Sequence, residues 1–205
     1  MKNKSKLIDN LMNQDKERLK RLFNFIAKGV KIMDPFTTYI SDKVKIGKGT
    51  VIYPLTYIES EVTIGKNCHI GPYARLRKGS KIKDTAAIGN FVEVVRSTVS
   101  EGSKAKHLTY LGDTFIDKQV NIGAGTIIAN YDGKNKNKTV IKKGAFIGSG
   151  SILVAPIRIG KNAITGAGAV VTKNRHVPDN TVVIGVPAKI MIAKGLSPKR
   201  KEIQI

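Results

Sequence analysis

The sequence predicts an all-β fold, a parallel β-helix of six-residue repeats, with a helical segment before it and a short tail after it. Three observations support this: an aliphatic residue at every sixth position, a small or β-branched residue four positions after each, and Gly, Asn or Asp between them. A helix has an apolar period of about 3.6 residues and a strand a period of about 2. A period of six instead indicates short strands joined by turns and stacked in coils. We expect the helical segment at 1–30, the β-helix at 31–187 and the tail at 188–205.

The helical segment is predicted by an apolar stripe within residues 5–28, ended by Gly29. The stripe comprises Leu7, Leu11, Leu19, Leu22, Phe23 and Ile26. An apolar stripe needs a surface to cover it. We therefore expect this helix to pack on the β-helix or on a neighbouring subunit.

The repeat itself is regular over ten positions. From Ile40 to Val94, every sixth residue is Ile, Leu or Val, and the residues four positions later, Val44 to Thr98, are all small or β-branched. We expect the large residues to fill the interior and the small ones to lie near corners. Glycines that follow the repeat, as in Ile46-Gly47, suit turns that need a positive φ or local side-chain hydrogen bonds.

The six-residue phase is interrupted twice. It is lost between Val99 and Leu111 and again across Tyr131–Lys138. A repeat tolerates an insertion only where the inserted chain can leave the coil, and such loops often carry function. We therefore expect a functional site at these interruptions.

Composition limits the partners. The net charge of +21 favours an anionic partner such as nucleic acid, anionic lipid or a phosphorylated ligand. Most lysines are dispersed, however, which is typical of a solvated surface, and the run Lys199–Lys201 in the tail is short. Aromatic residues make up 6% and Trp is absent, so stacking platforms for nucleic acid are scarce. We expect neither a nucleic-acid nor a membrane partner.

The single cysteine excludes an intrachain disulfide and fits a reducing cytoplasm. No apolar run of about 18 residues is present, and none follows the basic N-terminus, so neither a signal peptide nor a membrane span is expected. The prediction is a cytoplasmic protein.

Three histidines are candidates for chemistry. His69 lies inside the regular repeat and His176 in a polar loop, so both are expected at the surface without a catalytic role. Cys68 belongs to the small-residue series and is expected to be a buried structural thiol. His107 falls in the first interruption, and a neutral imidazole there could accept a proton from an amine. The three histidines form no ligand cluster, so no metal is expected.

Longer motifs carry a family resemblance. They are His107–Asp113, Asn121–Thr126, Asn130–Gly133 and Leu153–Pro156, supported by Gly71–Arg77, Gly89–Glu93 and Ile32–Pro35. Together, over roughly residues 28–175, they resemble the acetyltransferase half of a bacterial bifunctional enzyme family. That family combines an N-acetylglucosamine-1-phosphate uridylyltransferase with a glucosamine-1-phosphate N-acetyltransferase.

The resemblance implies a left-handed coil, a homotrimer with active sites between subunits, and acetyl-CoA as the acetyl donor. By the same match, His107 resembles the general base. The implied substrate-binding residues are Arg77 and Tyr110 on the sugar phosphate, Asn121 on the sugar and Lys136 from a loop nearby. The implied acetyl-CoA contacts are Ala124, Asn130, Tyr131, Ser149 and Ala167. A guanidinium suits a phosphate because its donors form a planar fork.

Three departures from the family pattern qualify this match. Nothing resembles the uridylyltransferase domain, so we expect no nucleotidyl transfer. Val95 stands where the family has a phosphate-binding lysine, and the adjacent Arg96 would point to the opposite face of a strand. Gly185 stands where the family has an arginine near CoA.

The sequence thus predicts an acetyl-CoA-dependent N-acetyltransferase acting on an amino-sugar phosphate, with glucosamine 1-phosphate as the leading acceptor. The alternatives are another amino sugar, for example a nucleotide-linked one, which Val95 favours, a non-catalytic trimeric scaffold, or a basic binding module. The presence of His107, Asn130 and Tyr131 argues against a scaffold.

Overall fold

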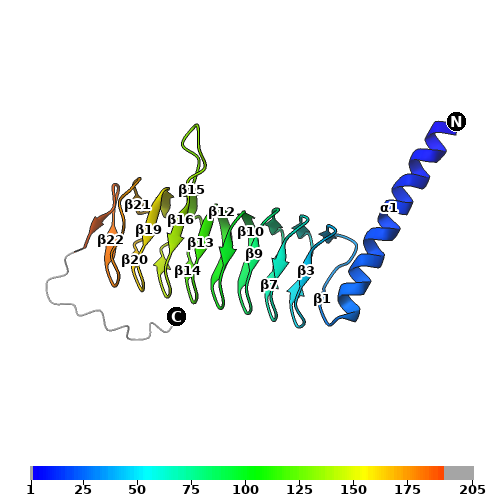
Figure 1. Ribbon diagram of the computed structural model, residues 1–205, viewed down its shortest axis with the longest axis horizontal. Helices are drawn as coiled ribbons and strands as arrows, with labels where there is room; N and C mark the ends of the chain where they lie inside the picture. The colour runs from blue at the N-terminus through cyan, green and yellow to red at the C-terminus, as the bar shows by residue number, and fades with distance from the viewer. Residues whose placement is uncertain (1, 192–205) are drawn as a thin grey trace.

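The computed structural model describes residues 2–191, which form an N-terminal helix followed by a parallel β-helix (Figure 1). The last residues of the predicted tail, including the run Lys199–Lys201, lie outside the described residues. Helix α1 (Lys2–Ala27) leans away from the first coil (Figure 1). It ends at Ala27, two residues before the predicted stop Gly29, whose φ of 85° is the left-handed conformation that closes helices.

The apolar stripe of α1 is covered only in part. Leu22 is fully buried and belongs to the same core as the β-helix, whereas Leu11 and Phe23 leave 57% and 58% of their surface exposed. Arg18 fixes the helix to the first coil, since its guanidinium donates to the carbonyl oxygens of Pro35 and Thr38, both at 2.8 Å. The C-terminal half of α1 therefore packs as expected, while its outer apolar residues find no cover within this chain's described residues.

The β-helix consists of three columns of short parallel strands. The first column holds β1 (Lys31–Ile32), β4 (Val51–Ile52), β7 (His69–Ile70), β14 (Asn121–Ile122), β17 (Phe146–Ile147), β20 (Ile164–Thr165) and β22 (Val182–Ile184). The second holds β2 (Tyr39–Ile40), β5 (Tyr57–Ile58), β8 (Arg75–Leu76), β15 (Ile127–Ala129), β18 (Ile152–Val154) and β21 (Val170–Val171). The third holds β3 (Lys45–Ile46), β6 (Thr63–Ile64), β9 (Lys81–Ile82), β11 (Thr98–Val99), β13 (Thr114–Ile116), β16 (Thr139–Ile141) and β19 (Ile157–Ile159).

Two longer strands join the first and second columns. Strands β10 (Ala87–Val95) and β12 (Lys104–Gly112) each run round the corner between them, and they pair with each other in parallel. We call the outward surface of the second column the site face. Its first edge is the corner toward the first column, and its second edge is the corner toward the third column.

Stacking in register explains why the same type of side chain recurs at each interior position of the repeat. Ile52 pairs with Ile70, and Ile70 pairs with Ile88, so each coil places the same type of side chain above its neighbour. All three are fully buried. The small-residue series is also interior from Val44 to Val92, with each member less than a tenth exposed. The six-residue period thus reports the interior of the coil, as predicted.

The first interruption was predicted as a loop that leaves the coil, and this prediction is wrong. Residues 104–112 do not leave the coil but form β12, in which Ala105 and Leu111 are fully buried interior residues. The phase shifts because two corners are each one residue short. Interior residues are five apart from Val94 to Val99, and again from Leu111 to Ile116. Both short corners lie on the second edge of the site face.

The second predicted interruption is confirmed as a loop. Residues 130–138, between β15 and β16, project from the β-helix (Figure 1). The loop leaves from the second edge, one coil after the two shortened corners. Three successive coils therefore depart from the regular repeat at the same edge.

Several glycines are required for a reason other than positive φ. Of the repeated Ile-Gly pairs, Gly71 has a positive φ of 96°, but Gly47 does not. A Cβ added at Gly47 would lie 2.6 Å from the backbone carbon of Gly65 on the next coil. Close approach of stacked backbones, rather than turn conformation, excludes a side chain there.

After residue 187, the predicted end of the β-helix, the chain folds back on the last coil. Ala188 is buried, and β23 (Lys189–Ile190) pairs antiparallel with β22. The first residues assigned to the tail thus cover the last coil. Over residues 2–191, no helix combines the length and the apolar character needed to cross a bilayer.

Candidate active site

His107 lies at the first edge of the site face, where β12 turns the corner. Its Nδ1 is 2.8 Å from Oδ1 of Asn90, its register partner on β10. An amide oxygen can only accept, so Nδ1 is the donor in this bond, and in the neutral imidazole the lone pair is then on Nε2. The imidazole is exposed and is therefore accessible as a base.

A groove of about 470 Å³ runs beside His107 over the first column. Besides His107 and Asn90, it is lined by Lys106 and by His69, which is 3.2 Å from the hydroxyl of Tyr53. His69 was expected at the surface without a role, and it is exposed there, but it shares this groove with His107. A larger hollow of about 1200 Å³ beneath α1 contains none of the predicted site residues.

The first edge continues past His107 as a line of small residues. The N–H of Gly125 donates to Leu108, that of Gly150 to Ala124 and that of Gly168 to Ser149, which places Ala124, Ser149 and Ala167 in successive coils after His107. Three of the five predicted acetyl-CoA residues thus form one line along the β-helix axis. Small side chains on this line leave the backbone open to a long, thin ligand.

The site face itself carries the two predicted phosphate contacts. Tyr110 lies on β12 opposite Glu93 of β10, and Arg77 follows β8 with 42% of its side chain exposed. Arg77 pairs with Glu93 at 3.3 Å and with Glu59 at 3.6 Å. The guanidinium is therefore held outward by two carboxylates, in a position where it can also meet an anion.

Val95 stands beside Arg77 on the neighbouring coil, because the N–H of Arg77 bonds the carbonyl of Val94. Val95 is 2% exposed but is not part of the interior core cluster. A lysine in its place would reach the same region as Arg77, so the valine removes one cation from this face. Arg96 does not replace it within the strand, because Arg96 sits in the following corner with φ of 47°.

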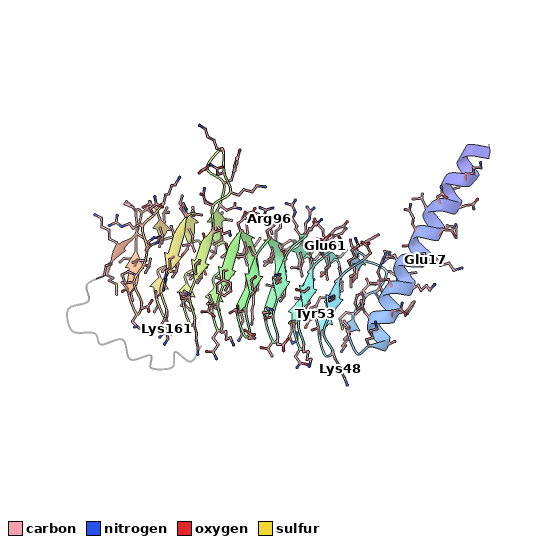
Figure 2. The ribbon with its side chains drawn as sticks, in the orientation of Figure 1. Glu17, Lys48, Tyr53, Glu61, Arg96 and Lys161 are labelled. Atoms are coloured by element: carbon pink, nitrogen blue, oxygen red, sulfur yellow. The ribbon has the colours of Figure 1, made fainter. Side chains whose placement is uncertain are left out.

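The second edge is built around Asp113. Arg96 donates to both carboxylate oxygens of Asp113, at 2.7 Å each, and Nδ2 of Asn130 donates to Oδ2 at 2.5 Å. The Arg96 guanidinium and then the Asn130 amide hold the pKa of Asp113 below its usual value. Figure 2 places Arg96 on the side of the β-helix from which the loop projects.

Tyr110 and Asn130 meet above Gly112. A Cβ added at Gly112 would lie 2.6 Å from Nδ2 of Asn130 and 2.7 Å from the hydroxyl of Tyr110. The glycine thus provides the space in which these two side chains lie against the backbone. One predicted phosphate contact and one predicted acetyl-CoA contact are brought together here.

The loop at residues 130–138 is ordered by Asp132. Its carboxylate accepts the N–H groups of Lys134 and Asn135, at 3.0 and 2.7 Å, and pairs with Lys173 at 3.5 Å. These bonds, the one from Asn135 foremost, lower the pKa of Asp132. The loop residues Tyr131 and Lys136 pair as an antiparallel bridge, which places their side chains side by side.

Asn121 is the one predicted site residue that this chain does not bring to the site face. It lies on β14 in the first column, between Lys104 and Phe146. The remaining predicted residues lie on the site face or its two edges. Within a single chain, Asn121 and Arg77 therefore face different directions.

The other reactive side chains have structural roles. Cys68 is fully buried, its thiol donates to the carbonyl of Lys83 at 3.0 Å, and burial raises its pKa. His176 accepts the backbone N–H of Arg158 at 3.0 Å. No group of three or more His, Cys, Asp or Glu side chains in residues 2–191 is placed to hold a metal ion.

Comparisons with known proteins now decide the family. The family described as bacterial transferase hexapeptide (six repeats) matches residues 43–78 and 138–173. The bifunctional protein GlmU of Thermotoga maritima is 43% identical over 222 residues, which cover 92% of this chain and 49% of that protein. The chain belongs to the hexapeptide-repeat acyltransferase family. It is homologous to the acetyltransferase region of GlmU.

Other relatives agree with this family. GlmU of Alcanivorax borkumensis is 54% identical over 128 residues, covering 62% of this chain and 28% of that protein. Among solved structures, LpxA, a UDP-N-acetylglucosamine acyltransferase from Bacteroides fragilis, matches with a TM-score of 0.52 and 18% identity over 76% of this chain and 72% of that chain. That likeness concerns the fold. The chain spans about half the length of the GlmU relatives that it matches.

Three residues of the acyltransferase site were given no role from the sequence. Asn90 orients His107, and Arg96 and Asp113 hold Asn130. Asn90 and Asp113 lie in motifs that the family resemblance already included, whereas Arg96 does not. The signal for the pairing of Arg96 with Asp113 is the pair of five-residue steps, because these place the two residues in stacked corners.

Proposed function

We propose that this acyltransferase transfers the acetyl group of acetyl-CoA to the amino group of an amino-sugar phosphate, with glucosamine 1-phosphate as the acceptor. The reaction is a direct transfer that needs no metal, and the protein works in the cytoplasm. The observation that carries the proposal is His107, oriented by Asn90 at 2.8 Å, at the head of the small-residue line formed by Ala124, Ser149 and Ala167.

The proton path follows from the hydrogen bond between His107 and Asn90. Because Nδ1 is the donor to Asn90, Nε2 accepts the proton that the amine loses as its nitrogen attacks the thioester carbonyl. The C–N bond forms, the C–S bond then breaks, and the proton on Nε2 passes to the departing thiolate. The amine becomes an amide and His107 returns to its neutral form.

The acetyl-CoA contacts are assigned to both edges of the site face. Ala124, Ser149 and Ala167 offer an open backbone along the first edge, and Asn130 and Tyr131 stand at the second. Arg77 supplies a planar fork of donors for the phosphate, with Tyr110 beside it and Lys136 from the loop. Asn121, on a different column, contacts the sugar from a neighbouring subunit.

A homotrimer supplies that neighbour. Ile127 and Ile152 point outward beside Tyr110 on the site face with 40% and 38% of their surface exposed, and Phe146 on the first column is 40% exposed. Outward positions of the third column include Lys45, Lys81 and Arg158, although Phe115 on β13 is also 43% exposed there. Light scattering at micromolar concentration should give the mass of a trimer, and a stable monomer would contradict this assembly.

A second acceptor class is favoured by one observation. Val95 occupies the place beside Arg77 where a lysine would add a cation, so the site face has fewer charges for a sugar 1-phosphate. A larger amino sugar, for example a nucleotide-linked one, would gain its affinity from contacts outside the phosphate position beside Arg77. This remains the alternative to glucosamine 1-phosphate.

The deciding experiment measures thiol release from acetyl-CoA against a panel of amino sugars. The panel contains glucosamine, glucosamine 1-phosphate and nucleotide-linked amino sugars, and Val95→Lys serves as the matched variant. We expect glucosamine 1-phosphate to give the highest kcat/KM and Val95→Lys to lower its KM. A nucleotide-linked sugar with a higher kcat/KM than glucosamine 1-phosphate would favour the alternative acceptor. If no amine in the panel releases thiol, the proposed acetyl transfer is refuted.

A further inference from the structure

We propose that Asp113 is a positioning residue that fixes which end of the Asn130 side-chain amide faces the ligand. This inference rests on the proposed function, in which Asn130 contacts acetyl-CoA. It assigns to Asp113 a task in ligand binding beyond the stability of the coil.

The hydrogen-bonding capacities of the three groups leave one arrangement. A guanidinium has only donors and an ionised carboxylate only acceptors. Arg96 occupies both oxygens of Asp113, and Oδ2 also accepts from Asn130, so the amide must turn its NH₂ group toward Asp113. Oδ1 of Asn130 is then directed away, and no donor among residues 2–191 bonds to it. Since Asn130 is only 5% exposed, its orientation is set by this bond rather than by solvent.

The fold prepares this arrangement through the two shortened corners. Arg96 and Asp113 occupy equivalent places in successive coils, with φ of 47° and 50°. Asn130 stands in the next coil at the start of the loop, 17 residues after Asp113, as Asp113 is 17 residues after Arg96. Three successive coils thus contribute the guanidinium, the carboxylate and the amide in order along the β-helix axis.

Asp113→Asn should turn the side-chain amide of Asn130 over, so that its NH₂ group faces the ligand in place of Oδ1. Asparagine keeps the volume of aspartate and tolerates the left-handed conformation, so the backbone is preserved. Because Arg96 offers only donors, the new amide must give it the oxygen and turn its NH₂ group toward Asn130. Asn130 then has to present its own oxygen to position 113, and its NH₂ group points to the ligand in place of Oδ1.

Removing the guanidinium should undo this reversal. In the double variant Arg96→Met/Asp113→Asn, methionine keeps the unbranched stem but has no donor. The amide at position 113 is then free to offer its oxygen to Asn130, which restores the original orientation. A merely structural role predicts the opposite, namely that the double variant is at least as impaired as Asp113→Asn.

The experiment compares wild type, Asp113→Asn, Arg96→Met and the double variant by acetyl-CoA titration calorimetry and by steady-state kinetics with glucosamine 1-phosphate. We expect Asp113→Asn to raise Kd and KM for acetyl-CoA ~10-fold, as the loss of one hydrogen bond does. Arg96→Met should change them less than threefold, and the double variant should recover most of the loss. Glu101→Gln is the control, since Glu101 pairs with Lys118 across the same 17-residue spacing, outside the site face.

The outcomes separate this inference from the proposed function. A wild-type protein that releases no thiol with any amino sugar refutes the function, and the calorimetric Kd values then decide the orientation alone. An active wild type with unchanged Kd and KM in Asp113→Asn overturns the inference. A double variant that binds acetyl-CoA as weakly as Asp113→Asn, or more weakly, overturns it as well.

Discussion

Replacing Gly112 by alanine places one methyl group where Tyr110 and Asn130 meet. The φ of Gly112 lies outside the left-handed region, so the methyl acts by the space it occupies and not by backbone strain. Its carbon would lie 2.6 Å from Nδ2 of Asn130 and 2.7 Å from the Tyr110 hydroxyl, whereas ordinary contact begins at 3.4 Å. Both groups therefore have to retreat by about 0.7–0.8 Å.

A displacement of this size should be costly for catalysis and moderate for stability. Misplacement by about 1 Å at a catalytic site can lower the rate ~10²-fold, so we expect kcat/KM of Gly112→Ala to fall by about that factor. Overpacking of this kind costs ~1–3 kcal/mol of the free energy of unfolding. Thiol release with glucosamine 1-phosphate measures the first quantity, and chemical denaturation measures the second.

Gly102→Ala is the matched control. Gly102 has φ of 68°, and a Cβ there would first meet Gln119 at 3.7 Å, so alanine adds backbone strain without a clash. We expect it to lose ~1 kcal/mol of stability and to keep its kcat/KM. Activity of Gly112→Ala within threefold of wild type, or an equal loss of activity in Gly102→Ala, would refute the role given to Gly112.

The remaining predictions concern the phosphate, the histidine partner and the helix. Arg77→Ala should raise KM for glucosamine 1-phosphate by the equivalent of ~1.5–3 kcal/mol and leave KM for acetyl-CoA unchanged; equal losses with phosphorylated and unphosphorylated sugars would contradict the assignment. Asn90→Ala should lower kcat about tenfold with little effect on either KM, since it frees the imidazole to take the other tautomer; steady-state kinetics at saturation tests this. Leu22→Ala should cost ~2–5 kcal/mol of unfolding free energy, measured by denaturation, because Leu22 is fully buried; Leu11→Ala, at an exposed position, is its control.

The interior of the β-helix could be predicted from the sequence because each coil repeats the same packing problem. Ile52, Ile70 and Ile88 stack directly on one another, so one local solution recurs at a fixed interval. The two shortened corners could not be recognised from the six-residue repeat. Ala105 fills an interior position that elsewhere holds a larger side chain, and its small size made residues 99–111 look like a lost phase.

The site was predicted less completely because its partners meet between coils. Asn90 and His107 are 17 residues apart, as are Asp113 and Asn130, and no local motif expresses such a pairing. It becomes visible only when the length of each coil is known. The outward apolar residues of α1 could be recognised from their spacing, but nothing among residues 2–191 covers Leu11 and Phe23.

The most direct test of the proposed acetyl transfer is kcat of His107→Ala with acetyl-CoA and glucosamine 1-phosphate at saturation. General-base catalysis typically contributes ~10²–10⁴-fold, so kcat should fall by two to four decades. The proposed trimer and the calorimetric Kd for acetyl-CoA should be retained, because His107 is exposed and is not part of the core. A variant that keeps more than about a tenth of the wild-type kcat would contradict the account.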